Sequence, residues 1–221
     1  MLEILAPAGN MECAKAAINS GADAVYLGFS AFSARQSAEN FDGEGLRSIV
    51  LYAHLCNVKV YVAMNTLVKD EEIPSFFDTL QCVWETGVDA IILQDVFLGK
   101  YIKSIYPEIV LHLSTQAGIC NENGAIFAKE CGFSRVILAR ETPLAEIAKI
   151  TKIIETEVFV QGALCYASIV KPDKTSANNA LYAAPAQYPL QVRMIFPPSQ
   201  MLCHQNLKDN SLCLPNFFLQ Q

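Results

Sequence analysis

Polar side chains follow several apolar segments of this chain, and they are the first candidates for chemistry. The stretch 110–118, Val-Leu-His-Leu-Ser-Thr-Gln-Ala-Gly, alternates apolar and polar residues before it breaks into small ones. Successive side chains of a strand point to opposite faces, so His112, Ser114 and Gln116 are predicted to share one face. An imidazole can transfer protons near neutral pH, and the other two can bind a substrate through hydrogen bonds.

Similar residues follow other apolar segments. The remaining candidates are Asn65, Gln94, Asp95, Arg140, Glu141, Gln161 and Cys165. Arg140 can clamp a carboxylate or a phosphate, and the Cys165 thiol can act as a ligand or a nucleophile, or be a bystander. Taken singly, a strand-end Asn or Gln is more often a cap or turn former, Arg140–Glu141 can be a local ion pair, and His112 can be a core histidine. Spacing alone assigns no nucleophile–base pair, so the prediction depends on polar residues ending five different strands.

Strand and helix patterns alternate along the chain. The predicted strands are 2–9, 23–28, 58–64, 89–93, 110–118, 135–139 and 157–160, and the predicted helices are 11–20, 45–56, 71–86, 96–106, 121–131 and 143–155. This alternation predicts parallel strands joined by right-handed crossovers, in an open doubly wound sheet or a closed (β/α)₈ barrel. Polar residues after nearly every strand, and no G-x-G-x-x-G after the first, favour the barrel, whose active sites lie at the carboxyl ends of the strands.

The chain changes character near its end. All 11 glycines lie at or before Gly162, whereas residues 167–221 hold six of the ten prolines. No eighth strand and helix are recognisable there. We therefore predict an incomplete (β/α)₈, TIM-barrel-like domain at 1–166 and an irregular tail at 167–221. A missing last strand would leave two sheet edges unpaired, which carries a risk of aggregation.

Composition restricts the function classes. No apolar run reaches the roughly 18 residues that span a bilayer, so a cytoplasmic protein without membrane contact is expected. The net charge of −6 argues against broad electrostatic binding of nucleic acid but leaves room for a local basic patch. Eight cysteines in a non-secreted chain are expected to be reduced thiols or metal ligands. The spacing of Cys203, His204 and Cys213 matches no zinc pattern.

Ordered sequence blocks resemble the collagenase-like peptidase family of the PrtC type. These blocks are LAPAGN at 5–10, GADAVYLG at 21–28, FSAR at 32–35, NF at 40–41, VKVY at 58–61, NTL at 65–67, QD at 94–95, LSTQ at 113–116, LARE at 138–141 and GALC at 162–165. The resemblance covers about three quarters of the chain. It implies a barrel-like α/β domain. Members were first called proteases, and several hydroxylate a transfer-RNA wobble uridine, a ribosomal-RNA cytidine or a ubiquinone precursor.

The resemblance also implies a cofactor and a second substrate. Those members carry a [4Fe–4S] cluster on four cysteines, and the RNA-modifying ones use prephenate. The first cluster cysteine follows Gly-Ala-Leu, which matches Cys165. The family continues with a second cysteine, a Gly- and Arg-rich stretch and a Cys-x-x-x-Cys pair, and this chain lacks all three. Its Gly-free tail resembles translation in a wrong frame, a hypothesis that resequencing the coding DNA would test.

The resemblance therefore implies an RNA hydroxylation protein whose partners are RNA and a prephenate-like molecule. Because a [4Fe–4S] cluster needs four thiolates or close substitutes, this chain is expected to assemble no intact cluster and to be inactive or poorly folded. Two alternatives stay open at this point. One is a peptidase, although the sequence has neither G-x-S-x-G nor H-E-x-x-H. The other is a non-catalytic binder of small molecules.

Overall fold

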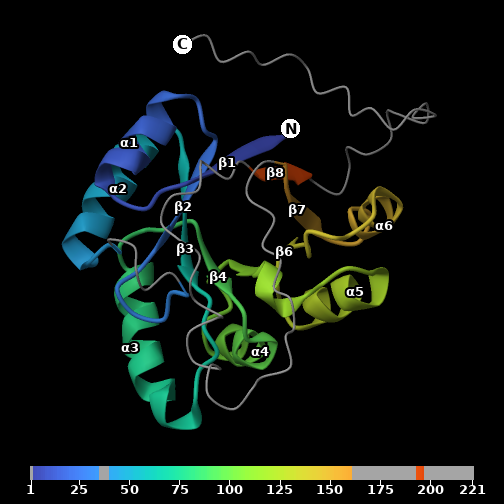
Figure 1. The fold of residues 1–221 in the computed structure, drawn as a ribbon. Coiled ribbons are helices and arrows are strands. Elements are labelled where there is room, and N and C mark those ends of the chain that lie inside the picture. Colours follow the sequence, from blue (N-terminus) through green and yellow to red (C-terminus); the bar gives the residue numbers. More distant parts are fainter. Residues whose placement is uncertain (1, 35–39, 161–192, 197–221) are drawn as a thin grey trace, which may run out of the picture.

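Eight strands curl into a closed barrel, and helices cover its outside (Figure 1). The computed structural model describes residues 2–34, 40–160 and 193–196. The strands are β1 (Glu3–Pro7), β2 (Ala24–Gly28), β3 (Lys59–Met64), β4 (Ala90–Leu93), β5 (Leu111–Leu113), β6 (Arg135–Ile137), β7 (Glu155–Phe159) and β8 (Arg193–Phe196). The helices are α1 (Met11–Asn19), α2 (Gly43–Leu55), α3 (Ile73–Trp84), α4 (Val96–Ile105), α5 (Glu122–Glu130) and α6 (Leu144–Ile150), with 3₁₀ turns η1 (Asp70–Glu72) and η2 (Thr115–Ala117).

Strands β1 to β7 pair in sequence order and run parallel, so the predicted barrel-like alternation of strands and helices is confirmed. Two element ends differ from the prediction by five residues, and the other differences are smaller. The predicted strand at 110–118 ends at Leu113, and its second half is the turn η2. The predicted helix at 143–155 ends at Ile150, and Glu155 already begins β7. Among the described residues, no helix is long and apolar enough to cross a membrane.

Closure of the barrel differs from the sequence-based expectation. The described residues contain no eighth parallel strand–helix unit, but β8 pairs antiparallel with β1 on one side and with β7 on the other. Glu3 lies opposite Ile195, and Val158 lies opposite Met194. The prediction that two sheet edges stay unpaired is therefore wrong. The predicted domain boundary at 166–167 falls outside the described residues, whereas β8 lies inside the predicted tail.

Side-chain caps fix where the helices begin. The backbone N–H of Cys13 donates to Asn10 Oδ1 at 2.9 Å before α1, and Gly45 donates to Asp42 Oδ1 at 2.7 Å before α2. Asp95 caps α4 and Asn121 caps α5 in the same way. Each cap satisfies a backbone donor that has no partner within the helix. All four caps follow strands or strand-end loops, so they set the carboxyl end of the barrel.

The barrel is filled and covered by two apolar clusters. The inner cluster lies in the lumen and comprises Leu5, Ala24, Tyr26, Tyr61, Ala63, Ala90, Ile92 and Ile137, with Phe159 packed against it. The outer cluster lies between the strands and the helices and includes Val25, Val60, Ile91 and Val136. The two sets alternate along each strand, as period-two geometry requires. This alternation decides which strand-end side chains face the lumen.

Candidate active site

Polar side chains meet at the carboxyl ends of three neighbouring strands. Asn65 follows β3, Gln94 follows β4 and Ser114 follows β5. Each continues the lumen-facing alternation of its strand, two residues beyond Ala63, Ile92 and His112, respectively. The backbone N–H of Ser114 donates to the carbonyl of Leu93 at 2.6 Å, which holds the ends of β4 and β5 side by side. The three residues therefore lie at the carboxyl ends of neighbouring strands, and the convergence of their side chains on one site stays a prediction.

A guanidinium lies at the same end of the lumen. Arg140 follows β6, and its Cζ lies 4.0 Å from the centre of the Phe159 ring. Phe159 ends β7 and packs against the inner cluster, so the stacked guanidinium is held at the carboxyl end of the lumen. Such stacking restricts the orientation of an arginine. A guanidinium is the group that suits a carboxylate or a phosphate. Glu141, the next residue, is exposed.

Several predicted substrate-binding residues also hold the backbone. Asn65 Oδ1 accepts a hydrogen bond from the N–H of Ala34 at 3.2 Å, which ties the β2–α2 loop to β3. Asp95 Oδ1 caps α4, and Ser114 Oγ accepts from the N–H of Gln116 in η2 at 3.3 Å. Ser114 is 2% exposed, whereas Gln116 is exposed. Asp95 and Ser114 thus make the capping contacts that the sequence analysis suggested for strand-end Asn and Gln, and a substrate role for any of the four stays a prediction.

A second feature of the carboxyl end is a cavity of about 250 Å³ between the first two helices. It is lined by Asn10, Met11, Asn40, Phe41, Asp42 and Gly45. The loop that forms it passes closely over Gly28, where a Cβ atom would lie 2.5 Å from Asn40 Oδ1 and 2.6 Å from Ser33 Oγ. Only glycine at the end of β2 leaves room for this loop. The cavity therefore lies beside the starts of α1 and α2.

His112 faces the lumen, but it lies deeper than the residues at the mouth. It pairs in register with Arg135, the first residue of β6, and its ring contacts Tyr61 edge-on with the centroids 4.8 Å apart. His112 is 3% exposed, and its Nδ1 has no hydrogen-bond partner among the described residues. The expectation that His112 stands on the rim with Arg140 is therefore wrong, because alternation predicts a face of the strand and not a height. A catalytic role for His112 stays a prediction.

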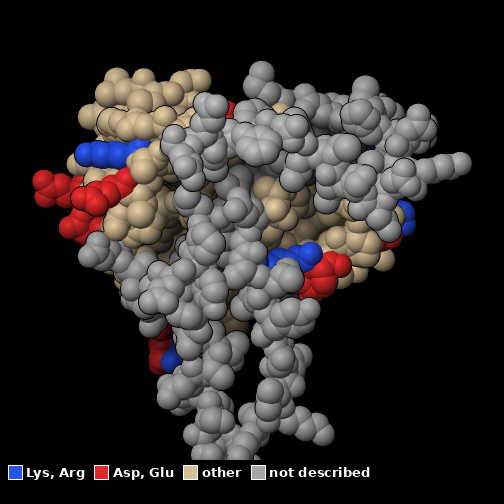
Figure 2. All heavy atoms as spheres, turned by 45° about the horizontal axis from the view of Figure 1, so that its top comes forward, with Lys and Arg blue, Asp and Glu red and all other residues tan. Residues whose placement is uncertain are grey.

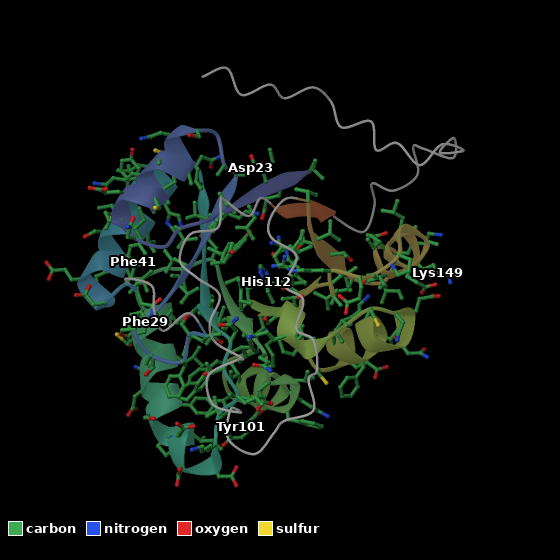
Figure 3. All side chains as sticks on the ribbon, viewed as in Figure 1. Asp23, Phe29, Phe41, Tyr101, His112 and Lys149 are labelled. Atoms are coloured by element: carbon green, nitrogen blue, oxygen red, sulfur yellow. The ribbon has the colours of Figure 1, made fainter. Side chains whose placement is uncertain are left out.

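The surroundings of His112 keep its imidazole neutral. Burial holds the pKa of His112 well below its usual range, and the positive charges of Arg135 and Lys59 lower it further. A neutral imidazole offers one donor and one acceptor nitrogen and carries no charge with which to bind an anion. Figure 3 shows His112 enclosed by the ring of strands.

A charged cluster near the amino end of the lumen was missed by the sequence-based prediction. Arg135 Nε donates to Glu155 at 3.0 Å, and its Nη1 lies 3.3 Å from Glu3 and 3.7 Å from Glu157. Glu3 also accepts hydrogen bonds from Lys59 at 2.8 Å and from the Tyr61 hydroxyl at 2.7 Å. The available signal was that four strands begin with an ionisable residue.

Pairing within this cluster shifts its pKa values. Burial alone would raise the pKa of Glu3, but the charge of Arg135 and hydrogen bonds from Lys59 and Tyr61 outweigh it and lower that pKa. Burial raises the pKa of Tyr61, and the charge of Glu3 raises it further, although Arg135 opposes both. Burial would lower the pKa of Arg135, but Tyr61, Glu155 and Glu3 raise it overall. The cluster is consequently a set of mutually compensated charges.

Comparison with known proteins identifies the family of this chain. Residues 9–169 match the family described as Peptidase family U32. This chain belongs to that family. A tRNA hydroxylation protein P1 of Bacillus subtilis is 36% identical over 167 residues, which are 75% of this chain and 40% of that protein. A 23S rRNA 5-hydroxycytidine C2501 synthase of Escherichia coli is 38% identical over 168 residues, which are 75% of this chain and 25% of that protein.

The fold of this U32 chain is also similar to a solved structure. The U32 peptidase Mk0906 matches with a TM-score of 0.58 at 15% identity, over 70% of this chain and 66% of that chain. At this identity the likeness shows the fold alone. The U32 chain spans well under half the length of both curated relatives that it matches.

The described cysteines of the U32 chain do not form a cluster site. Cys13 lies in α1, Cys56 follows α2, Cys82 lies in α3, and Cys120 and Cys131 flank α5; only Cys131 is buried. Within residues 2–34, 40–160 and 193–196, no group of three or more His, Cys, Asp or Glu side chains is placed to hold a metal ion. Cys165 and Gln161 lie outside those residues, so their predicted roles stay predictions. The described donors therefore do not fit a four-thiolate cluster.

Proposed function

We propose that this chain is the barrel part of an RNA base hydroxylation protein, with its substrate site at the carboxyl end of the barrel. The observation that carries the proposal is the similarity of three quarters of the chain to two proteins named for hydroxylation of tRNA and of rRNA. The position of the polar residues supports it, because they lie where barrel enzymes carry their active sites.

In this proposal Arg140 binds the anionic part of a small substrate. The guanidinium stacks on Phe159 and can present two parallel N–H groups to a carboxylate of a prephenate-like molecule. Gln94 and Gln116 then read the edge of the target base through amide donors and acceptors, and Glu141 supplies an exposed carboxylate for proton transfer. His112 contributes as a neutral hydrogen-bonding group deeper in the lumen.

The proposed [4Fe–4S] cluster requires ligands that the described residues do not provide. Cys165 is the position at which the family resemblance predicts one thiolate. Because the chain matches only 40% of one relative and 25% of the other, we infer that further ligands belong to sequence that this chain lacks. The chain alone is accordingly expected to be inactive as a hydroxylase.

Most RNA contacts are also expected to lie elsewhere in a complete protein. On the face shown in Figure 2, the Lys and Arg side chains of the described residues are isolated from one another and are interspersed with Asp and Glu. The net charge of the chain is −6. Binding of RNA without sequence preference needs clustered cations. The barrel is therefore proposed to hold the reacting base and the small anion, while other sequence holds the phosphate backbone.

A chimera tests the proposed function. It joins residues 1–160 of this chain to the remaining part of the Bacillus subtilis tRNA hydroxylation protein P1, in cells that lack the natural protein. We expect mass spectrometry of tRNA nucleosides to find the hydroxylated nucleoside restored. Arg140→Ala should abolish it, whereas Arg47→Ala, an exposed position on α2, should not. A folded chimera that restores nothing, or an Arg140→Ala chimera that works as well as its parent, would refute the proposal.

Peptidase activity is the alternative, and its support is that the matching family is described as a peptidase family. The sequence offers neither a nucleophile elbow nor a zinc-binding H-E-x-x-H motif. Incubating the purified chain with gelatin and casein separates the two functions. Proteolysis that survives chelation and is lost in Arg140→Ala would favour a peptidase that uses the same mouth.

A further inference from the structure

The outer face of α4 carries a stripe of exposed apolar side chains. Phe97 is 76% exposed, Tyr101 is 52% exposed and Ile105 is 45% exposed. The three are spaced four residues apart, so they lie on one face of the helix. At 1.5 Å per residue the stripe is about 12 Å long. An exposed aromatic stripe of this length is costly to leave in water unless something covers it.

A groove runs beside this stripe. It encloses about 260 Å³ between α4 and the segment that leads into α3, and it is lined by Val68, Asp70, Ile73, Asp95, Phe97, Leu98 and Tyr101. The Tyr101 ring meets the Phe77 ring of α3 edge-on at 5.6 Å, so the apolar floor continues onto the neighbouring helix. Figure 3 shows Tyr101 at the outer side of the barrel, where α3 and α4 meet. The shape suits an apolar side chain that enters from outside.

The described lining of the groove is acidic. Its charged residues are Asp70 and Asp95, and no lysine or arginine is among the described residues that line it. The turn η1 adds Glu71 and Glu72 next to Asp70. Lys69, whose Nζ lies 4.0 Å from Glu71, offsets one of these charges. An acidic apolar groove repels phosphate groups and attracts cations. RNA is therefore a poor occupant of this surface, although the groove begins at Asp95, directly beyond the mouth residue Gln94.

A second copy of the chain is also disfavoured as occupant. A two-fold dimer places the same patch on both sides, so Asp70 and Asp95 of one copy would approach the same acidic patch of the other. The remaining strongly exposed apolar side chains of the outer helices, such as Leu51 and Leu55 of α2, belong to another face of the barrel. That face carries the exposed Arg47, but its contact with the groove would be head-to-tail and not two-fold, and the oligomeric state measured below tests it.

We propose that this groove binds a basic amphipathic helix of a partner protein. Apolar side chains spaced three and four residues apart on that helix would pack between Phe97, Tyr101 and Phe77, and its flanking Lys or Arg side chains would pair with Asp70 and Asp95. Helix-in-groove recognition uses this combination of periodic apolar anchors and peripheral charge. The groove adjoins the barrel mouth at Asp95, but the proposal does not depend on the RNA site.

Fluorescence anisotropy with defined peptides tests the proposal on the full 221-residue chain. The probe is a labelled peptide of about 18 residues, long enough to form a helix, with leucines on one face and lysines on the other. We expect binding that weakens about tenfold or more for Phe97→Ser and for Tyr101→Ser, as expected when an aromatic anchor is lost. Leu55→Ser, at a 79% exposed site on α2, is the matched control and should bind like the unaltered chain.

Three results would overturn the proposal. The first is equal binding of a peptide in which every lysine is replaced by glutamate. The second is equal weakening by Leu55→Ser, which would mark non-specific adhesion. The third is a change of oligomeric state in Tyr101→Ser by sedimentation, which would make a second copy the occupant. Circular dichroism melts of all variants are expected to coincide, because the substituted side chains are exposed.

Discussion

Arg135 is a buried charge that depends on carboxylates from two strands. It is 2% exposed and is surrounded by Glu3, Glu155 and Glu157 within 3.7 Å. Removing one member of such a set leaves the others buried without compensation. We expect Arg135→Met to lower the free energy of unfolding by about 3–5 kcal/mol, measured by urea denaturation. Lys59→Met, which removes a half-exposed partner of Glu3, should cost no more than about 1 kcal/mol. Equal effects of the two would contradict this account.

His112 makes the stability depend on pH. Its pKa is lowered in the folded state by burial and by Arg135 and Lys59, so the unfolded chain binds a proton more readily than the folded one. The stabilising contribution is complete above the unfolded pKa of about 6.5 and is lost as the pH falls below it, by at most about 1.4 kcal/mol per pH unit.

His112→Phe keeps a ring against Tyr61 and removes the titration. Urea denaturation between pH 7 and pH 5 should show a shallower loss of stability for this variant than for the natural chain. The window lies above the pKa range of Glu3, whose own contribution is lost only at lower pH, because its folded pKa is lowered from 4.5. His54→Gln, at an exposed position paired with Asp89, is the control. An unchanged slope in His112→Phe would show that other groups set the pH dependence.

At the residue scale, the sequence predicted which face of a strand a side chain occupies better than how deep it lies along the barrel lumen. Alternation correctly placed His112 on the lumen face of its strand, because side-chain parity follows from the backbone alone. It could not place His112 at its depth, because depth along the lumen depends on the stagger between neighbouring strands. Glu3, Lys59 and Arg135 are charged residues at the first positions of strands, and their side chains have the same parity as the lumen residues. A charged residue at the start of a strand is, however, equally typical of a strand end that is exposed to solvent.

At the scale of elements, a repeated turn sets the amino end of the barrel. Gly21 and Gly87 adopt positive φ values of 91° and 88° after their helices, where a side chain would be strained. Two residues later, Asp23 accepts from the N–H of Ile4 at 2.8 Å, and Asp89 accepts from the N–H of Val60 at 2.7 Å. The similar sequences at 21–25 (GADAV) and 87–91 (GVDAI) therefore form the same turn, which ties each strand to the one before it.

Substitution of Asp89 tests this turn. Asp89→Ala leaves the Val60 N–H without its acceptor, and we expect it to lower the free energy of unfolding by about 1–3 kcal/mol in thermal or urea denaturation. Asp89→Asn keeps an oxygen at the same place and should recover most of that loss. If both variants are equally destabilised, the charge pairing with His54 matters more than the turn hydrogen bond.

Close packing of α4 on the following unit is a second property of the elements. A Cβ atom on Gly99 would lie 2.3 Å from the ring of Phe133, so the helix can approach only because this position has no side chain. Overpacking of this kind costs about 1–3 kcal/mol, and we expect Gly99→Ala to lower the melting temperature accordingly. Gly43→Ala, at a helical site whose nearest contact would be 3.7 Å away, should be neutral or slightly stabilising. Recovery in Gly99→Ala with Phe133→Leu would confirm the cause.

Element boundaries could be predicted where the chain carries a chemical signal. Helix N-termini are marked by Asn10, Asp95 and Asn121, because the side-chain oxygen of each replaces a missing backbone acceptor. The end of α6 was missed because no glycine follows it, unlike the helices that end before Gly21 and Gly87, and the apolar pattern runs on to Ile154. Helix and strand periods cannot be distinguished over so short an apolar run.

For the whole molecule, closure depends on a strand that the sequence pattern hides. The four residues of β8 fit no strand–helix repeat, lie far from β7 along the chain and run antiparallel to both neighbours. Periodicity identifies repeated units. It could therefore predict the seven parallel strands but not β8, which belongs to no repeated unit. Without β8, the edges of β1 and β7 would expose backbone N–H and C=O groups able to pair with another chain.

Two truncations measure what β8 contributes. A chain ending at Phe196 retains every described strand and helix, whereas a chain ending at residue 192 loses β8 and leaves β1 and β7 without their antiparallel partner. We expect the first to keep a cooperative thermal transition and to elute as one species, and the second to aggregate and to bind a dye that reports exposed apolar surface. A barrel whose closure needed nothing beyond β7 would give the same melting curve and elution profile for both. Loss of folding in both would instead assign the closing role to residues 197–221.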